Sequence, residues 1–93
     1  MTVEILRGDT AALPSCELVD ELLPAAESDV LTLACTDSDL NAAYRVLRAV
    51  MDYGYAHDRP ARVRLVCADD TAYRAYSFQW NMWFVERKPE HEE

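Results

Sequence analysis

The sequence has only two glycines in 93 residues, Gly8 and Gly54, and this scarcity excludes the common phosphate-binding loops. A P-loop and a dinucleotide-binding fingerprint each place several glycines within a few positions, because the backbone must approach the phosphate oxygens closely. Two glycines so far apart can form neither motif. The chain therefore holds no nucleotide through a glycine-rich loop.

The cysteines are few and badly spaced for metal binding. There are three, Cys16, Cys35 and Cys67, and no two lie closer than nineteen residues. Zinc sites and disulfide frameworks use short, paired spacings such as CxxC, which are absent here. We expect three reduced, buried thiols, no metal and no cofactor.

Positive charge is also scarce, since seventeen acidic residues face nine basic ones and the net charge is −8. Such a chain repels the nucleic-acid backbone, so direct binding of DNA or RNA is not expected. An acidic surface favours partners that carry basic patches.

Long apolar runs are missing as well. No stretch approaches the roughly 20 apolar residues of a membrane-spanning helix, so no membrane association is expected. The first residues lack the basic and apolar regions of a signal peptide, which predicts a cytoplasmic protein. The length predicts a single α/β domain over 1–87, followed by a polar tail over 88–93.

The chain does contain apolar segments with the spacing of strands and of helices in turn, and their sequence predicts a β-α-β-α-β-α order. Val30–Cys35 is almost entirely apolar, which is typical of a strand at the centre of a parallel sheet. Arg62–Cys67 alternates Arg with apolar residues, which favours an edge strand with one wet face. We predict a small, mostly parallel sheet with right-handed crossovers. The expected strands are 2–6, 30–35 and 62–67, and the expected helices lie near 15–23, 38–53 and 70–86.

Turn and capping residues mark the helix ends. Ser15 is a natural cap for the first helix, and Pro24 is expected to end it. The segment 36–39 supplies capping oxygens for the second helix, and Asp69 and Asp70 supply them for the third. The stretch 31–37 also matches 63–69 at an offset of 32 residues, as repeated strand–helix units would.

The C-terminal element concentrates ring surface, with six of the nine aromatic residues between positions 73 and 84. As a helix, the segment gathers most of its rings on one arc. As a strand, it alternates equally well, and aromatic residues favour strands. The aspartate caps and the helical first turn over 71–75 favour the helix.

This segment carries more apolar surface than one side of a three-stranded sheet can cover. We assign Tyr73, Tyr76 and Trp80 to the core. Large side chains left in water are costly, and aromatic residues dominate binding energies at interfaces. We therefore expect an interface formed by four residues: Phe78, Met82, Trp83 and Val85.

Aspartates follow all three predicted strands, at Asp9, Asp37 and Asp69. The carboxyl ends of parallel strands meet at one edge of the sheet, where open α/β sheets bind ligands. Carboxylates gathered there could hold Mg²⁺ against a phosphate. The competing interpretation, which we favour, is that each aspartate caps the helix that follows it.

The sequence has no recognisable catalytic constellation. His57 lies in a predicted surface loop, and a cysteine could pair with it only if the fold brought the two together. We assign no catalytic residue and do not expect an enzyme.

Two segments resemble parts of a known family. Val3-Glu4-Ile5-Leu6-Arg7-Gly8-Asp9-Thr10 resembles the opening strand and Gly-Asp turn of macro domains, and 63–76 is similar to the strand and helix that close them. The resemblance implies three-layer α/β packing and a nucleotide ligand. The Asn-rich and Gly-rich loops that hold ADP-ribose in that family have no counterpart here.

The function that these patterns favour is a small acidic interaction or regulatory module, without enzymatic activity. It would bind a protein partner or form a homo-oligomer through the aromatic C-terminal element. Accessory factors of bacteria and phages often have this character. The alternative is a small α/β protein, distantly similar to macro domains, that binds a nucleotide or metal at Asp9, Asp37 and Asp69.

Overall fold

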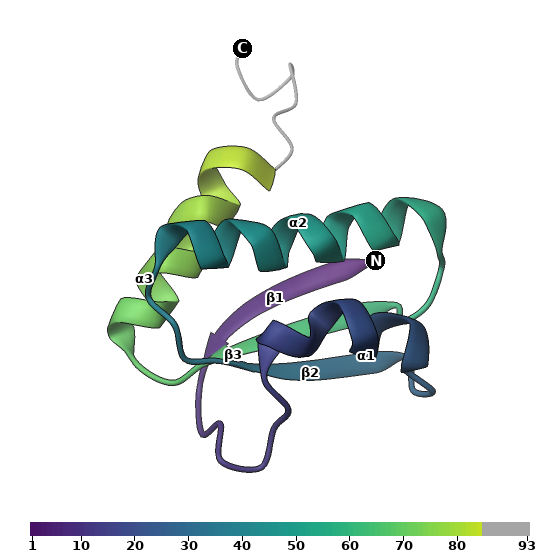
Figure 1. The fold of residues 1–93 in the computed structure, drawn as a ribbon, viewed down its shortest axis with the longest axis horizontal. Coiled ribbons are helices and arrows are strands. Elements are labelled where there is room, and N and C mark those ends of the chain that lie inside the picture. The colour runs from purple at the N-terminus through teal and green to yellow at the C-terminus, as the bar shows by residue number, and fades with distance from the viewer. Residues whose placement is uncertain (85–93) are drawn as a thin grey trace.

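Three parallel strands form one sheet, as the apolar segments predict: β1 (Thr2–Arg7), β2 (Val30–Cys35) and β3 (Arg62–Cys67). They alternate along the chain with helices, so the predicted α/β class is confirmed (Figure 1). The structure is a computed structural model that describes residues 1–84. Val85 and the predicted tail at 88–93 lie outside the described residues.

The strand order is β1-β3-β2, which corrects two predictions. The central strand is β3, and β2, predicted to be central, lies at an edge. The alternation of Arg and apolar residues in 62–67 shows that one face of this strand is exposed to water, but it does not show that the strand lies at an edge of the sheet. Arg62 and Arg64 of β3 project from the sheet face that carries Glu4. Their Nε atoms lie 3.8 and 3.3 Å from its carboxylate oxygens.

The apolar run of β2 also has a local cause. The chain before α1 runs along the outer edge of β2, where Ser15 pairs with Ala34 in parallel. The Ala34 amide donates to the Pro14 carbonyl at 2.7 Å. Ala34 is buried beside this segment, although β2 is an edge strand of the sheet formed by the described residues.

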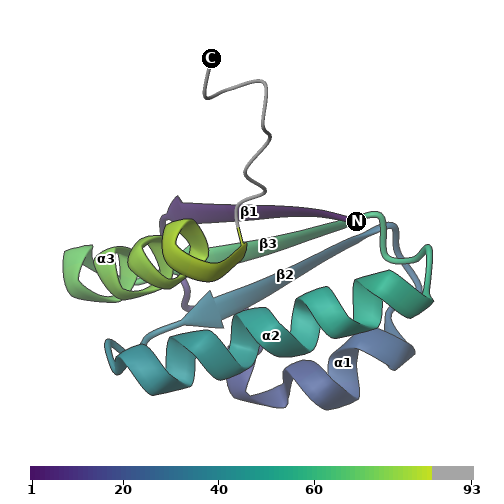
Figure 2. The same cartoon turned by 90° about the horizontal axis from the view of Figure 1, so that it is seen from above.

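The helices all pack on one face of the sheet, which makes two layers (Figure 2). Within the described residues no helix covers the face that carries Glu4, so the three-layer packing implied by the macro-domain resemblance is wrong. The connections β1–α1–β2 and β2–α2–β3 run in opposite directions across the sheet. With both helices on one face they have opposite hands, and the expectation that both are right-handed is wrong.

The first helical segment begins with a 3₁₀ turn, η1 (Cys16–Leu18), and continues as α1 (Val19–Ala25). Ser15 caps it as predicted, since its Oγ accepts from the Glu17 amide at 3.1 Å. Pro24 lies in the last turn of α1 and not beyond it. The helix passes Pro24 by one residue and ends at Ala25, so the predicted end is wrong by that residue.

The second helix, α2 (Leu40–Ala56), is the longest, and its apolar face carries Ala43, Leu47 and Val50 into the core. The C-terminal element is helical, which decides between the two predictions. It consists of α3 (Asp70–Gln79) and a π-helical turn, η2 (Trp80–Phe84). No helix within residues 1–84 has the length and apolar character needed to cross a membrane.

The core lies between the sheet and the three helices. Its fully buried side chains come from every layer, which shows that the helices and the sheet share one core. The largest of them are Tyr76, Leu33, Leu47, Leu65, Val50 and Val63.

Candidate functional site

The three strand-end aspartates each accept a hydrogen bond from a nearby backbone amide. Asp9 accepts from Ala11 at 3.0 Å, within the loop after β1. Asp69 caps α3, because its carboxylate accepts from the Ala72 amide at 2.9 Å and from the Thr71 hydroxyl at 2.8 Å. The Ala72 amide and then the Thr71 hydroxyl lower the pKa of the Asp69 carboxyl.

The second helix is capped differently from the prediction. The Asp39 carboxylate accepts from the Asn41 amide and is the N-cap of α2. Asp37 accepts from the Asp39 amide at 2.9 Å, which closes the turn before the helix. Spacing alone does not distinguish the two, because either aspartate can reach an amide two residues on.

Acidic groups do not form a metal-binding cluster in the part of the chain that the structure describes. Among residues 1–84, no group of three or more Asp, Glu, His or Cys side chains is arranged so that it could hold a metal ion. The metal or nucleotide alternative gains no geometric support, and the Asp9, Asp37 and Asp69 carboxylates are explained by the turns and the helix that they stabilise.

An aromatic surface, formed by Phe78, Met82 and Trp83, lies on the outside of α3 and η2. The three side chains are 51%, 48% and 65% exposed. All three were assigned to an interface from sequence. Val85, the fourth, lies outside the described residues.

The inner side of the same element packs against the domain. Tyr76 is fully buried, and Trp80 packs against the core, as predicted. Tyr73 is 37% exposed, so its assignment to the core is wrong. It lies beside Val3 and Ile5 of β1, and within residues 1–84 no strand lies beyond β1 to enclose it.

A ring cluster holds the aromatic surface in place. The ring of Tyr44 on α2 meets Trp83 edge-on at 6.4 Å between centroids, and meets Phe84 at 5.5 Å. Its hydroxyl accepts from the Arg48 guanidinium at 3.1 Å. The sequence pattern does not single out Tyr44, because nothing in it indicates that α2 and η2 are neighbours. Edge-to-face pairs of this kind fix ring orientation.

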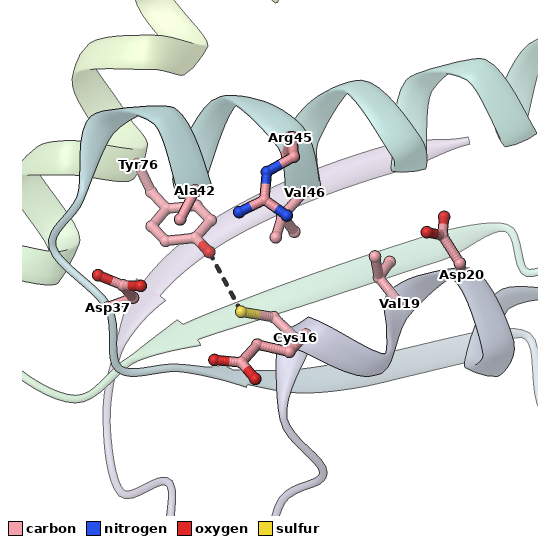
Figure 3. Close-up of a pocket in the computed structure, with 9 residues that line it drawn as sticks. Cys16, Val19, Asp20, Asp37, Ala42, Arg45, Val46 and Tyr76 are labelled. Carbon is pink, nitrogen blue, oxygen red and sulfur yellow. Dashed lines mark hydrogen bonds between the residues drawn. The ribbon is translucent and has the colours of Figure 1, made fainter.

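A cavity of about 450 Å³ lies between the start of α1 and the first turns of α2 (Figure 3). Its wall includes the Cys16 thiol and the Tyr76 hydroxyl, whose Sγ and Oη atoms lie 3.1 Å apart. Arg45 contributes a positive charge, and Asp20 and Asp37 contribute negative ones.

The three cysteines lie side by side below this cavity. Cys35 and Cys67 are partners in the parallel register of β2 and β3. Cys16 follows Ser15 as Cys35 follows Ala34, and Ser15 and Ala34 are themselves paired. The row therefore runs Cys16, Cys35, Cys67. All three are buried, as predicted, and free, but no local sequence pattern indicates that they are neighbours.

Hydrogen bonds along this row shift the pKa values of Cys16 and Cys35 in opposite directions. The Cys35 thiol donates to Cys16, which is the main cause that lowers the pKa of Cys16 to about 7; Tyr76 acts in the same direction. Burial and the Glu17 carboxylate oppose this shift. Hydrogen bonding to Cys16 and Cys67, together with burial, raises the pKa of Cys35 far above its usual value. Burial also raises the pKa of Tyr76, which stays a neutral donor.

Comparison with known proteins adds no assignment: no protein-family model, no curated protein and no solved structure matches this chain.

Proposed function

We propose that the protein is a non-enzymatic interaction module of the cytoplasm, an accessory or regulatory factor that binds protein through its aromatic surface. The observation that carries the proposal is the exposure of Phe78 on α3 and of Met82 and Trp83 on η2. Large exposed apolar patches mark interaction sites on soluble proteins.

The occupant that we propose for this surface is a second copy of the chain. The charges near it are balanced, since α3 carries one acidic and one basic residue, Asp70 and Arg74. Asp70 is also paired with Arg7. The net charge of −8 opposes association only at long range, and physiological salt screens exposed charges beyond about 8 Å.

The expected association is weak. A stable interface buries about 800 Å² on each partner, which is more than three side chains supply. Fully burying one large apolar side chain is worth roughly 1.5–3 kcal/mol. Phe78, Met82 and Trp83 are already partly buried, and association costs translational and rotational freedom, so only a small surplus remains.

Sedimentation velocity over a concentration series tests the proposal. The wild-type protein should associate as its concentration rises, whereas Phe78→Asp and Met82→Asp should remain folded monomers. The matched control is Tyr55→Asp, because Tyr55 is 81% exposed in the last turn of α2, away from the aromatic surface. This control should associate as the wild-type protein does.

The effect of added salt on binding distinguishes a second copy of the chain from a basic partner protein. Association of two acidic copies through apolar side chains should strengthen with added salt, whereas binding to a basic protein should weaken. A wild-type protein that stays monomeric throughout, or a Phe78→Asp variant that associates normally, contradicts the proposal. Unfolding of both Asp variants would show that the surface belongs to the core.

A further inference from the structure

One thiol of the row, that of the buried Cys16, lines the cavity, and the other two do not. Cys16 lines this cavity, whereas Cys35 and Cys67 are fully buried and do not contribute to its wall. Cys16 is therefore the thiol of the row that borders the cavity (Figure 3).

We propose that Cys16 is a site of reversible oxidation by hydroperoxides, and that Cys35 resolves the oxidised thiol as an intramolecular disulfide. The register carries this inference, because it places one recessed thiol beside a small cavity and a second thiol directly behind it.

The chemistry needs only a hydroperoxide and the two thiols. The Cys16 sulfur attacks one oxygen of the O–O bond; an S–O bond forms, the O–O bond breaks, and the leaving oxygen takes up the thiol proton as an alcohol or water. The Cys35 sulfur then attacks the sulfenic acid. An S–S bond forms, the S–O bond breaks, and the hydroxyl leaves with the Cys35 proton as water. Two electrons pass from the thiols to the peroxide.

Geometry selects Cys35 and rejects Cys67 as the resolving thiol. Neighbouring strands lie about 4.8 Å apart, and a disulfide needs Cα atoms about 4.4–6.8 Å apart. Cys16 and Cys35 occupy neighbouring positions of the row. Cys67 lies one strand further on, at about twice that spacing from Cys16.

The surroundings of Cys16 favour its reactive form. The thiolate is the nucleophile, and the Tyr76 hydroxyl and the Cys35 thiol both donate hydrogen bonds that stabilise it. The negative charge of Glu17 opposes the thiolate. Asp20, Asp37 and Arg45 lie on the same cavity wall. Tyr76 is a positioning residue here, because it acts through the sulfur.

The test is oxidation of the native protein with stoichiometric hydrogen peroxide, followed by intact mass and peptide mapping. The wild-type protein should lose the mass of two hydrogens, show a Cys16–Cys35 link and recover with dithiothreitol. Cys67→Ser is the matched control and should form the same link. Cys35→Ser should stop at a sulfenic acid on Cys16, which dimedone traps.

Two further variants define the reactive thiol. Cys16→Ser should consume peroxide at least about tenfold more slowly, because the remaining thiols are enclosed. In the wild-type protein the oxidation rate should rise with pH through about 7. Tyr76→Phe should move this midpoint upward, which a purely structural tyrosine would not do.

Several results would overturn the proposal. One is a link that contains Cys67, and another is loss of the link in Cys67→Ser. A third is a native protein whose thiols resist peroxide while the denatured chain reacts. Because the wild-type mapping needs no substitution, a variant that fails to fold leaves the test decisive.

Discussion

At the scale of single residues, short polar side chains set the ends of the helices. Asp39 and Asp69 accept amide hydrogens from the first turns of α2 and α3, and Ser15 does the same at η1. These bonds satisfy donors that a helix cannot satisfy internally.

Substitution of Asp39 tests which aspartate caps α2. Asp39→Ala should lower the free energy of unfolding by about 0.5–2 kcal/mol, whereas Asp39→Ser should retain most of it, because a serine hydroxyl accepts the same bond. Asp37→Ala should cost less, since Asp37 bonds only to the Asp39 amide outside the helix. Urea denaturation measures all three. Equal losses for Asp37→Ala and Asp39→Ala would contradict this assignment.

At the scale of elements, the position of β3 decides how the domain is held together. It pairs with β1 on one side and with β2 on the other, over the full length of each. Its inward side chains, Val63 and Leu65, are fully buried, while its outward arginines face water beside Glu4. A strand can therefore be central and still alternate.

Two valine substitutions measure this difference between the strands. Val63→Ala should lower the free energy of unfolding by about 2 kcal/mol, because it removes fully buried methyl groups. Val30→Ala, at a 40% exposed position of β2, should change stability by less than about 0.5 kcal/mol.

Amide hydrogen exchange supplies an independent measurement of the same point. The amides of β3 should exchange more slowly than those of the outer strands, since they open only with the whole sheet. Faster exchange in β3 than in β2 would contradict the strand order.

At the scale of the whole molecule, access to the thiols depends on opening of the fold. Cys35 and Cys67 lie between the sheet and the helices, and Cys16 is buried at the wall of the cavity. We expect slow labelling of the native protein by a bulky thiol reagent, with Cys16 reacting first. Denaturant should expose three equivalent thiols. A colorimetric thiol titration checks this, and rapid labelling of all three thiols in the native state would contradict the core described above.

Much of the fold was determined by local sequence alone. Apolar alternation, capping residues and helical spacing predicted the three strands, the three helices and their order, because these signals act between residues a few positions apart. The exposed positions Phe78, Met82 and Trp83 also followed from an excess of apolar surface over what a small sheet can cover.

Only the tertiary structure decided the strand order, the opposite hands of the crossovers, and the contacts around the aromatic surface and the row of cysteines. Tyr44 meets Trp83, and Cys16 meets Cys35, across segments distant in the sequence. Such contacts depend on register and on which face each helix covers, and no local pattern encodes them. The physical reason is that the same alternation is compatible with every order of three strands in the sheet, so packing of the whole chain selects one.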